Sequence, residues 1–255
     1  MNLFEILLAD LSEGTISEVR VGAFWTAIVA ETNGELHCGL AASLRPEVHI
    51  HGGAPDVPGA GSLIGEDAHT LAGFVNSQSV MERVIGMATI NALLPRYESM
   101  WTEGNAGAIL ARRGIDKRVA MIGHFPFAED LRREVGTLWV LELHPRNDDL
   151  PADAAPEILP QADVVAITGT TLLNGTFDEL IALCRKDAYI MVLGPTTPLS
   201  PVMFDCGVDM VSGAAVDTSH AKIDKMLAAV SQGAAFRQLH RSGAVRLVNM
   251  ERTAS

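Results

Sequence analysis

Residues 163–201 read DVVAITGTTLLNGTFDELIALCRKDAYIMVLGPTTPLSP, and they decide the fold of the second half of the chain. Two apolar runs, DVVAIT at 163–168 and AYIMVL at 188–193, lack polar alternation and are separated by a helical stretch. Such strands are typical of a parallel sheet covered on both faces. Ligands of these sheets bind beyond the carboxyl ends of the strands. We therefore expect the loops Gly169–Thr176 and Gly194–Pro201 to hold a small ligand.

The same alternation of strands and helices extends to both sides of this stretch. Further strands are expected at 119–123, 137–143 and 208–211, with a last edge strand at 245–250. Helices are expected at 106–113, 127–135, 177–186 and 219–232. Thr176 and Glu179 have the spacing of a capping box at the start of the helix at 177–186. The second half therefore predicts a parallel-sheet α/β domain covered by helices on both faces.

The first half has a different pattern, with strands and one long helix. Strand-like runs at 18–30 and 36–43 flank Thr32-Asn33-Gly34, which is a good hairpin turn because Asn and Gly tolerate positive φ. A helix is expected at 79–94, where Ser79 and Glu82 have the capping-box spacing. Shorter features are a helix at 2–11, a long irregular loop at 45–65 and a boundary region at 96–105. We expect a small α+β domain at 1–103 and the parallel-sheet α/β domain at 104–255.

Composition and charge exclude several classes of partner. The formal net charge is −12, and such an acidic chain repels nucleic acid and anionic membranes. Three cysteines without regular spacing argue against a disulfide framework. The N-terminus lacks a basic region and a cleavage site, and no apolar run reaches the length of a membrane span. We therefore expect a cytoplasmic protein, and the sequence leaves its oligomeric state open, a homo-oligomer included.

The first strand of the second half ends in Gly123-His124-Phe125-Pro126. A dinucleotide fold has G-x-G-x-x-G at this point, so the two missing glycines and the bulky side chains disfavour NAD. Glu142 lies 19 residues after Gly123, where an acidic residue binds ribose in that fold. His124 is suited to acid–base chemistry or to metal binding, and a structural histidine at a helix start is an equal alternative.

The two loops of the opening stretch are rich in hydroxyl groups and prolines. Thr170, Thr171 and Asn174 precede an expected helix, and backbone N–H groups and hydroxyls at such a place can bind an anion. The alternative is that Thr176 only caps the helix and Asn174-Gly175 only forms a turn. Gly194-Pro195-Thr196-Thr197 is stiffened by proline, which suits a pre-organised site and suits plain chain reversal equally.

Metal-ligating residue types are present without a tight signature. The chain has no C-x-x-C and no H-E-x-x-H motif. Cys184 is expected in the core, and Cys206 is open to either interpretation. The dispersed candidates are His49 with His51, His37 with Cys38, and Asp217 with His220. His49 and His51 would share one face of a strand, although this region is expected to be a loop.

Several runs carry a resemblance to a known family. They are FVNSQSVMERVIGMATINALLP at 74–95, VAMIGHFPF at 119–127, ADVVAITGTTLLNGTFDELIAL at 162–183, and VLGPTTPLSP with GVDMVSGAAV at 192–216. Together they resemble a family of unknown function catalogued as putative heavy-metal chelation proteins. The resemblance implies a domain similar to the enolase N-terminal domain, followed by a Rossmann-like domain, with the proposed active site in a cleft between the two.

Mapped by motif, the resemblance implies a set of residues that face this cleft. From the second domain they are His124, Glu142, Thr170, Thr171, Asn174, Thr176, Pro195, Thr196 and Thr197, and from the first Asn76, Ser77 and Asn91. Asn91 shares a face with apolar residues of its helix and therefore needs a polar partner. A structural hydrogen bond to the other domain is the alternative to ligand contact.

Three functions remain open. The first is binding of a heavy metal, or of a metal-chelating small molecule, in the interdomain cleft, with the cofactor left open, a transition-metal ion included, and with His124, His49 and His51 as candidate ligands. The second is an enzyme that acts on a small anionic or nucleotide-like substrate, with His124 or Glu142 in proton transfer. The third is a regulatory or scaffold subunit.

Overall fold

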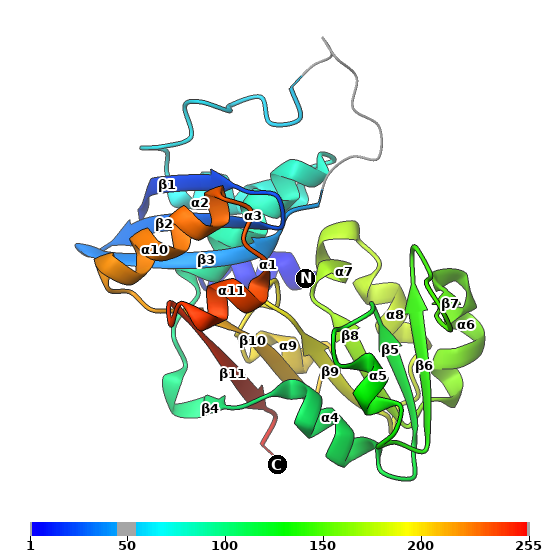
Figure 1. The fold of residues 1–255 in the computed structure, drawn as a ribbon. Coiled ribbons are helices and arrows are strands. Elements are labelled where there is room, and N and C mark those ends of the chain that lie inside the picture. The colour runs from blue at the N-terminus through cyan, green and yellow to red at the C-terminus, as the bar shows by residue number, and fades with distance from the viewer. Residues whose placement is uncertain (1, 45–54, 254–255) are drawn as a thin grey trace.

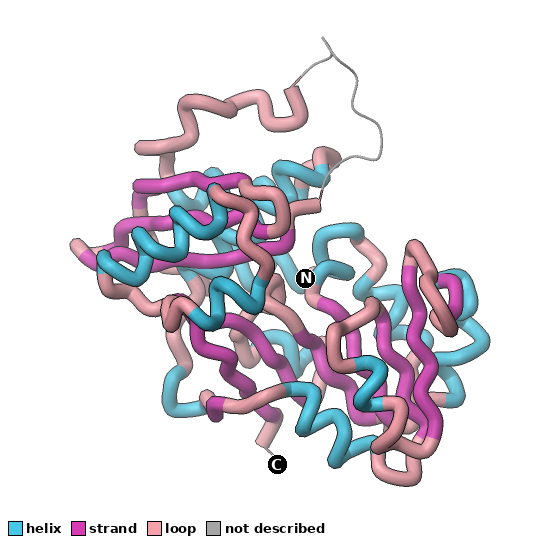
Figure 2. The backbone as a smooth tube through the Cα atoms, in the orientation of Figure 1, coloured by secondary structure: helices cyan, strands magenta, loops and turns pink. Residues whose placement is uncertain are grey.

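The computed structural model describes residues 2–44 and 55–253 and contains two sheets (Figures 1 and 2). The small antiparallel sheet has the order β1-β2-β3, and the large sheet has the order β4-β11-β10-β9-β8-β5-β6-β7. The strands of the small sheet are β1 (Thr15–Val21), β2 (Trp25–Thr32) and β3 (Glu35–Ala42). Those of the large sheet are β4 (Thr102–Glu103), β5 (Arg118–Ile122), β6 (Thr137–Glu142), β7 (Leu150–Pro151), β8 (Val164–Thr168), β9 (Tyr189–Leu193), β10 (Met210–Val216) and β11 (Val245–Glu251). The predicted fold class, a small α+β part followed by a Rossmann-like parallel sheet, is confirmed.

Helices cover both sheets. In the first part of the chain they are α1 (Leu3–Ala9), α2 (Ala68–Ala72) and α3 (Val80–Leu93), with short 3₁₀ turns at η1 (Gly73–Asn76) and η2 (Glu98–Met100). In the second part they are α4 (Ala106–Gly114), α5 (Ala128–Leu131), α6 (Ala155–Ile158), α7 (Thr170–Asn174), α8 (Phe177–Leu183), α9 (Val202–Asp205), α10 (His220–Ser231) and α11 (Phe236–Arg241), with η3 (Ala152–Ala154) and η4 (Leu159–Gln161). None of the described helices is both long and apolar enough to cross a membrane.

The small sheet follows the predicted hairpin and adds a strand. Asn33 and Gly34 have φ of 54° and 81°, as the sequence predicted, and Thr32 pairs with Glu35 across the turn. The run at 18–30 is two strands rather than one, because the chain turns back between β1 and β2, where the Gly22 N–H donates to the Trp25 carbonyl over 2.9 Å. The alternation of apolar residues continues through this turn, so the sequence pattern did not reveal it.

Helix α3 packs on one face of the small sheet at very close range. A Cβ added to Gly39 of β3 would lie 2.1 Å from the Ala88 carbonyl oxygen of α3, so only glycine allows this approach. The Ser79 hydroxyl caps α3 by accepting from the Glu82 N–H, as predicted. The predicted capping box is incomplete, however, because the Glu82 carboxylate accepts from the Ser77 hydroxyl instead of the Ser79 N–H.

The opposite face of the small sheet is covered by a helix from the far end of the chain. Helix α10 lies across this sheet in Figure 1, and its Ile223, Met226 and Val230 form one buried cluster with Val29 and Leu40 of the sheet. The small sheet is therefore enclosed between α3 and α10, which are separated by more than a hundred residues. Packing crosses the predicted division at 103/104, which itself stays a prediction.

The large sheet is parallel except at one end. Strands β7, β6, β5, β8, β9 and β10 run parallel in this spatial order, which is the 3-2-1-4-5-6 order of a doubly wound fold. Strand β11 then pairs antiparallel with β10. The prediction that 245–250 is an edge strand is wrong, because β4 pairs with the outer side of β11.

Several local predictions in the second part need correction. The helix expected at 127–135 is α-helical only over α5, and the one expected at 177–186 ends at Leu183. Thr176 makes no side-chain cap, because its hydroxyl donates to Asn174 Oδ1 over 2.8 Å. The loop expected at 169–176 contains α7, and α6, β7 and α11 were not predicted. Each of these elements has seven or fewer residues, too few for periodicity to identify.

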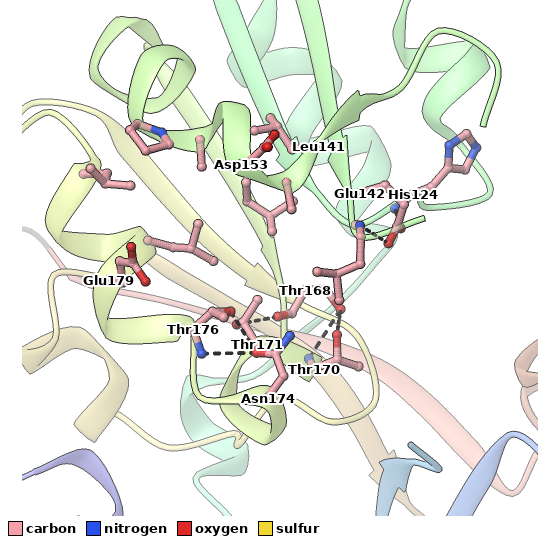
Figure 3. Close-up of a pocket in the computed structure, with 18 of the residues that line it drawn as sticks. His124, Leu141, Glu142, Asp153, Thr168, Thr170, Thr171, Asn174, Thr176 and Glu179 are labelled. Carbon is pink, nitrogen blue, oxygen red and sulfur yellow. Dashed lines mark hydrogen bonds between the residues drawn. The ribbon is translucent and has the colours of Figure 1, made fainter. Parts of the chain in front are cut away.

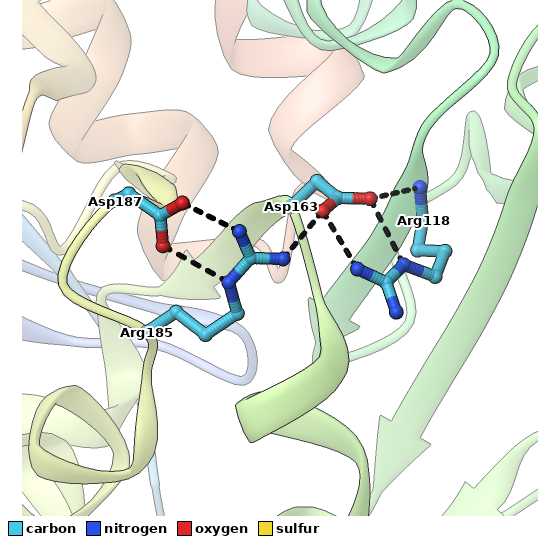
Figure 4. A network of polar contacts seen from close by, with 4 residues as sticks. All are labelled: Arg118, Asp163, Arg185 and Asp187. Carbon is cyan, nitrogen blue, oxygen red and sulfur yellow. Dashed lines mark hydrogen bonds and ion pairs between the residues drawn. The ribbon is translucent and has the colours of Figure 1, made fainter.

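A polar network fixes the amino-terminal ends of β5 and β8 (Figure 4). Asp163 accepts from the backbone N–H, Nε and Nη2 of Arg118, at 2.9 to 3.0 Å, and from Nη1 of Arg185 over 2.6 Å. Arg185 also forms an ion pair with Asp187. Hydrogen bonds from Arg118, with support from Arg185, hold the pKa of Asp163 well below its ordinary value. The carboxylate is therefore ionised wherever the fold is intact at ordinary pH.

We expect Asp163→Asn to lower the free energy of unfolding at pH 7, because it removes the charged acceptor of Arg118 and Arg185. The loss should be only roughly 1 kcal/mol, because these ion pairs are partly exposed to water. A lowered folded-state pKa stabilises the fold above the unfolded-state pKa of about 3.9, and this contribution disappears as pH falls toward the folded-state value. The difference in the free energy of unfolding between wild type and variant should therefore become smaller below about pH 4. Urea unfolding at several pH values measures it, and Asp187→Asn, which touches only Arg185, is the control with the smaller effect. An equal gap at all pH values contradicts the assignment.

A second prediction concerns Gly39. We expect Gly39→Ala to lower the free energy of unfolding by at least about 2 kcal/mol, because the new methyl group meets backbone atoms of α3 that cannot move independently. Gly73→Ala is the matched control, since a Cβ there meets nothing within 4 Å. Chemical denaturation followed by circular dichroism measures both variants, and equal effects would show that the close approach of α3 is not required.

Candidate functional site

Two pockets open at the carboxyl edge of the large sheet. The first, called the strand-end pocket, has a volume of about 560 Å³ and lies beyond the ends of β5, β6 and β8 (Figure 3). The second, called the interdomain pocket, has a volume of about 740 Å³ and lies between the ends of β8 to β11 and the small sheet. Phe125, Thr168 and Thr170 line both pockets and separate them.

The strand-end pocket contains six of the predicted site residues. One side carries hydroxyl groups, where Thr168 and Thr170 share a hydrogen bond of 3.0 Å between their Oγ1 atoms. The buried Thr171 hydroxyl donates to the Thr168 carbonyl over 2.8 Å, which fixes the start of α7 on the end of β8. The predicted residues that line this pocket are His124, Glu142, Thr170, Thr171, Asn174 and Thr176.

The other sides of the strand-end pocket carry carboxylates, as Figure 3 shows. Glu142 is held in place because its Oε2 accepts from the His124 N–H and its Oε1 accepts from the Leu143 N–H, each over 2.9 Å. Asp153 and Glu179 are exposed at the rim. None of the residues that line the pocket in the described part of the chain is lysine or arginine. The electrostatic field of this pocket therefore favours cations and disfavours anions.

His124 has a carboxylate partner that the sequence did not identify. Its Nδ1 lies 3.0 Å from both carboxylate oxygens of Asp149, and the Asp149 side chain is only 2% exposed. Figure 3 shows the imidazole at the margin of the pocket, apart from the threonines. Asp149 belongs to the run RNDDL at 146–150, where nothing in the sequence distinguishes it from Asp148. The pair orients the ring and leaves Nε2 without a hydrogen-bond partner among the described residues.

The interdomain pocket has a more apolar character. Trp25 and Ala42 of the small sheet face Phe125, Phe127 and Phe236 of the second part. The polar groups that line it include Thr196, Ser212, Asp130 and Arg237, and Arg237 is the only lysine or arginine among the described residues that do so. Of the predicted residues, Thr170, Pro195 and Thr196 line this pocket.

Asn91 and Thr196 connect the two parts of the chain. Asn91 Nδ2 donates to the Leu40 carbonyl over 2.9 Å and to the Thr196 carbonyl over 3.1 Å. The Thr196 hydroxyl accepts from the Ala42 N–H over 3.0 Å. The alternative weighed for Asn91, a structural hydrogen bond to the other domain, is what the geometry shows. With Thr197, Asn91 lines a separate cavity of only about 30 Å³.

The remaining first-domain candidates lie away from both pockets. Asn76 is exposed, and the Ser77 hydroxyl is occupied by the Ser79 N–H and the Glu82 carboxylate. The nearby cross-domain contact comes instead from Arg83, whose Nε donates to the Leu173 carbonyl of α7 over 2.6 Å. The sequence shows only that Arg83 belongs to the helix that begins after Ser79, and it does not reveal this contact.

The described residues contain no group of three or more His, Cys, Asp and Glu that could hold a metal ion. Burial raises the pKa of the Cys38 and Cys206 thiols, and it raises that of Cys184 to about 11. Thiolate is the form that binds metals, so this shift disfavours all three as ligands. Cys184 packs against the core, as predicted. His49 and His51 lie outside the described residues.

We expect Asn91→Ala to lower the free energy of unfolding by about 1–3 kcal/mol, because it removes two hydrogen bonds and leaves two interior carbonyls without this donor. Asn76→Ala, at an exposed position of η1 whose side chain has no hydrogen-bond partner among the described residues, is the control with little effect. Urea unfolding measures both. Identical midpoints for the two variants would show that the Asn91 contacts contribute nothing to the joint between the domains.

Comparisons with known proteins agree with this architecture. Two family models described as "Putative heavy-metal chelation" match residues 4–94 and 107–249. An uncharacterized protein of Methanocaldococcus jannaschii is 28% identical over 186 residues, which are 71% of this chain and 70% of that protein.

Two solved structures of proteins of unknown function are similar over nearly the whole chain. The protein from Desulfitobacterium hafniense has a TM-score of 0.78 at 25% identity, and 98% of each chain is covered. The protein from Pyrococcus horikoshii has a TM-score of 0.79 at 21% identity, also with 98% of each chain covered, and this second likeness concerns the fold alone. The two family matches include the small sheet, the parallel strands of the large sheet and the loops at its carboxyl edge, and the chain therefore belongs to the family described as "Putative heavy-metal chelation".

Proposed function

We propose that this protein binds a small organic molecule in the interdomain pocket, and that a heavy metal enters as a complex of that molecule. The observation that carries the proposal is the pocket itself. Its volume of about 740 Å³ lies within the range of small-molecule sites, and side chains of both domains line it. The Asn91 and Thr196 hydrogen bonds hold these walls together before any ligand binds.

The lining of the pocket favours a planar ligand that places a negatively charged group at Arg237; the carboxylate of Asp130, which also lines the pocket, is paired with Arg133. Trp25, Phe125, Phe127 and Phe236 offer aromatic faces and edges to a flat ring. Arg237 at the exposed rim provides a cation for a carboxylate or a phenolate. Aromatic chelators combine a flat ring with such oxygens, so this chemistry agrees with the description of the family.

A bare ion is the less favoured cargo. Structural metal sites in proteins need three or four converging donors, and residues 2–44 and 55–253 bring no such group together. A chelating molecule supplies these donors itself. In that case the protein has only to recognise the molecule, because the chelator and water coordinate the metal.

The proposal is tested by titration of the full-length protein, purified without a metal-affinity tag, with dipicolinate, 8-hydroxyquinoline-5-sulfonate and catechol. Each chelator is added alone and with Zn²⁺ or Ni²⁺, and the metals are also added alone. We expect at least one chelator to quench tryptophan fluorescence and to raise the melting temperature. Ala42→Trp should abolish this response by filling the pocket, whereas Ala221→Trp, on the exposed side of α10, should preserve it.

Two outcomes would count against the proposal. If the metals alone change the fluorescence and the melting temperature as much as the chelators do, the protein itself coordinates the metal. The absence of a response to all three chelators, with and without metal, would remove the interdomain pocket as their site.

A second candidate function is catalysis, and the pairing of His124 with Asp149 favours it. A buried carboxylate that binds Nδ1 fixes the tautomer of the ring, and Nε2 can then transfer a proton at the strand-end pocket. Glu142 is less suited to this role, because both of its oxygens already accept backbone N–H groups. Between the two residues proposed for proton transfer, the geometry therefore favours His124.

The catalytic alternative predicts a specific pattern of loss. Compounds that bind the protein are incubated with it and followed by mass spectrometry for chemical change. We expect His124→Ala to abolish conversion and Asp149→Asn to reduce it by about 10²-fold or more while the melting temperature of each variant stays close to that of wild type. If the wild-type protein converts no bound compound and His124→Ala melts well below wild type, His124 has a structural role.

A further inference from the structure

The strand-end pocket is a second binding site with chemistry of its own. It combines a carboxylate that is fixed in position, an apolar floor and a rim of further carboxylates. It shares only Phe125, Thr168 and Thr170 with the interdomain pocket. At about 560 Å³ it lies within the size range of small-molecule sites. From these features we infer that the strand-end pocket binds an unphosphorylated nucleoside.

Glu142 provides the anchor for a ribose. Its two oxygens accept the His124 and Leu143 N–H groups, each over 2.9 Å, and these bonds hold the carboxylate at the end of β6. Each carboxylate oxygen has two lone pairs, so one acceptor position on each oxygen remains for a ligand. The adjacent 2′- and 3′-hydroxyl groups of a ribose present two donors at matching spacing. In sheets of this strand order, an acidic residue at the end of the second strand binds the ribose hydroxyls.

The apolar floor accounts for the base rather than for a second sugar. Leu141, Leu180 and Leu183 line the pocket beside the fixed carboxylate. Leu143, directly after Glu142, is 63% exposed although it is large and apolar. Leu141 and Leu180 are already buried, so a flat base would remove from water mainly the exposed Leu143 and the half-buried Leu183. A free sugar would bring hydroxyl groups to the same surface and gain no such burial.

The charges of the pocket exclude a phosphate. Glu142, Asp153 and Glu179 line it, and no lysine or arginine does so in the described part of the chain. Phe125 and Pro126 follow Gly123 and His124 at the place where a dinucleotide fold uses further glycines to bring its backbone N–H groups to a pyrophosphate. A phosphorylated ligand would therefore meet three carboxylates without a lysine or arginine to compensate its charge.

The inference is tested by isothermal titration of the full-length protein with the four common ribonucleosides, their 2′-deoxy analogues and their 5′-monophosphates. We expect at least one ribonucleoside to bind. Its 2′-deoxy analogue should bind about tenfold more weakly or worse, because it loses one hydrogen bond to a charged acceptor. Its 5′-monophosphate should also bind at least about tenfold more weakly, because of repulsion by the rim.

Charge reversal at the rim distinguishes this site from accidental binding. In the double variant Asp153→Lys with Glu179→Lys, both changes are at exposed positions, and we expect the preference for nucleoside over monophosphate to be lost or reversed. Asp148→Lys, also exposed but outside the pocket lining, is the control that should keep the preference.

The inference is overturned if no ribonucleoside binds, if the deoxy analogue binds equally well, or if Asp148→Lys changes the preference as much as the double variant does. The double variant alters the strand-end pocket alone, because neither Asp153 nor Glu179 lines the interdomain pocket. A negative result here therefore leaves the chelator experiments standing, and a negative chelator result leaves this inference standing.

Discussion

The joint between the two sheets depends on the side-chain amide of Asn91. It donates to one backbone carbonyl on β3 and to another in the loop after β9. Both acceptors are main-chain atoms, so the amide sets the position of two chain segments and not only of two side chains. The Thr196 hydroxyl adds a third bond, to the Ala42 N–H, from the same loop. The wall of the interdomain pocket formed by Ala42, Pro195 and Thr196 follows from these three contacts.

The enclosure of the small sheet makes this joint rigid. A three-stranded sheet has two faces to cover, and α3 covers one of them at the close distance that Gly39 permits. Helix α10 covers the other face although it follows the last parallel strand of the large sheet. The chain therefore leaves the small sheet, builds the large one and returns. Relative motion of the two parts would expose apolar surface on α10 and on the sheet, which opposes a hinge at this place.

The sequence predicted the features that depend on long apolar patterns and strong turns. The parallel strands, α3, α10 and the Asn33-Gly34 hairpin follow from periodicity and from backbone preferences that act within a few residues. Features set by contacts between distant segments were not predictable in this way. Thr176 has the spacing of a cap but binds Asn174, and Asn76 has the polarity of a site residue but faces solvent.

Asp149 illustrates the same limit at the candidate site. Its partner His124 is 25 residues away, and they meet only because β5 and β6 run parallel and bring their carboxyl ends together. The sequence placed His124 and Glu142 at these ends correctly, since a strand end can be read from the pattern of one strand. The loop that carries Asp149 has no such pattern. Which of its two aspartates turns inward depends on packing that only the structure shows.

The carboxyl edge of the large sheet is divided into two pockets because Phe125 stands where a dinucleotide fold has its second glycine. In a dinucleotide fold, small residues after the first strand leave a continuous groove for one long ligand. Here Phe125 occupies that position and lines both pockets, together with Thr168 and Thr170. The groove is thus interrupted where a pyrophosphate would cross it. The charges differ on the two sides, with carboxylates and no lysine or arginine in the strand-end pocket, and with Arg237 and Asp130 in the interdomain pocket. The two ligands proposed above would therefore occupy separate pockets.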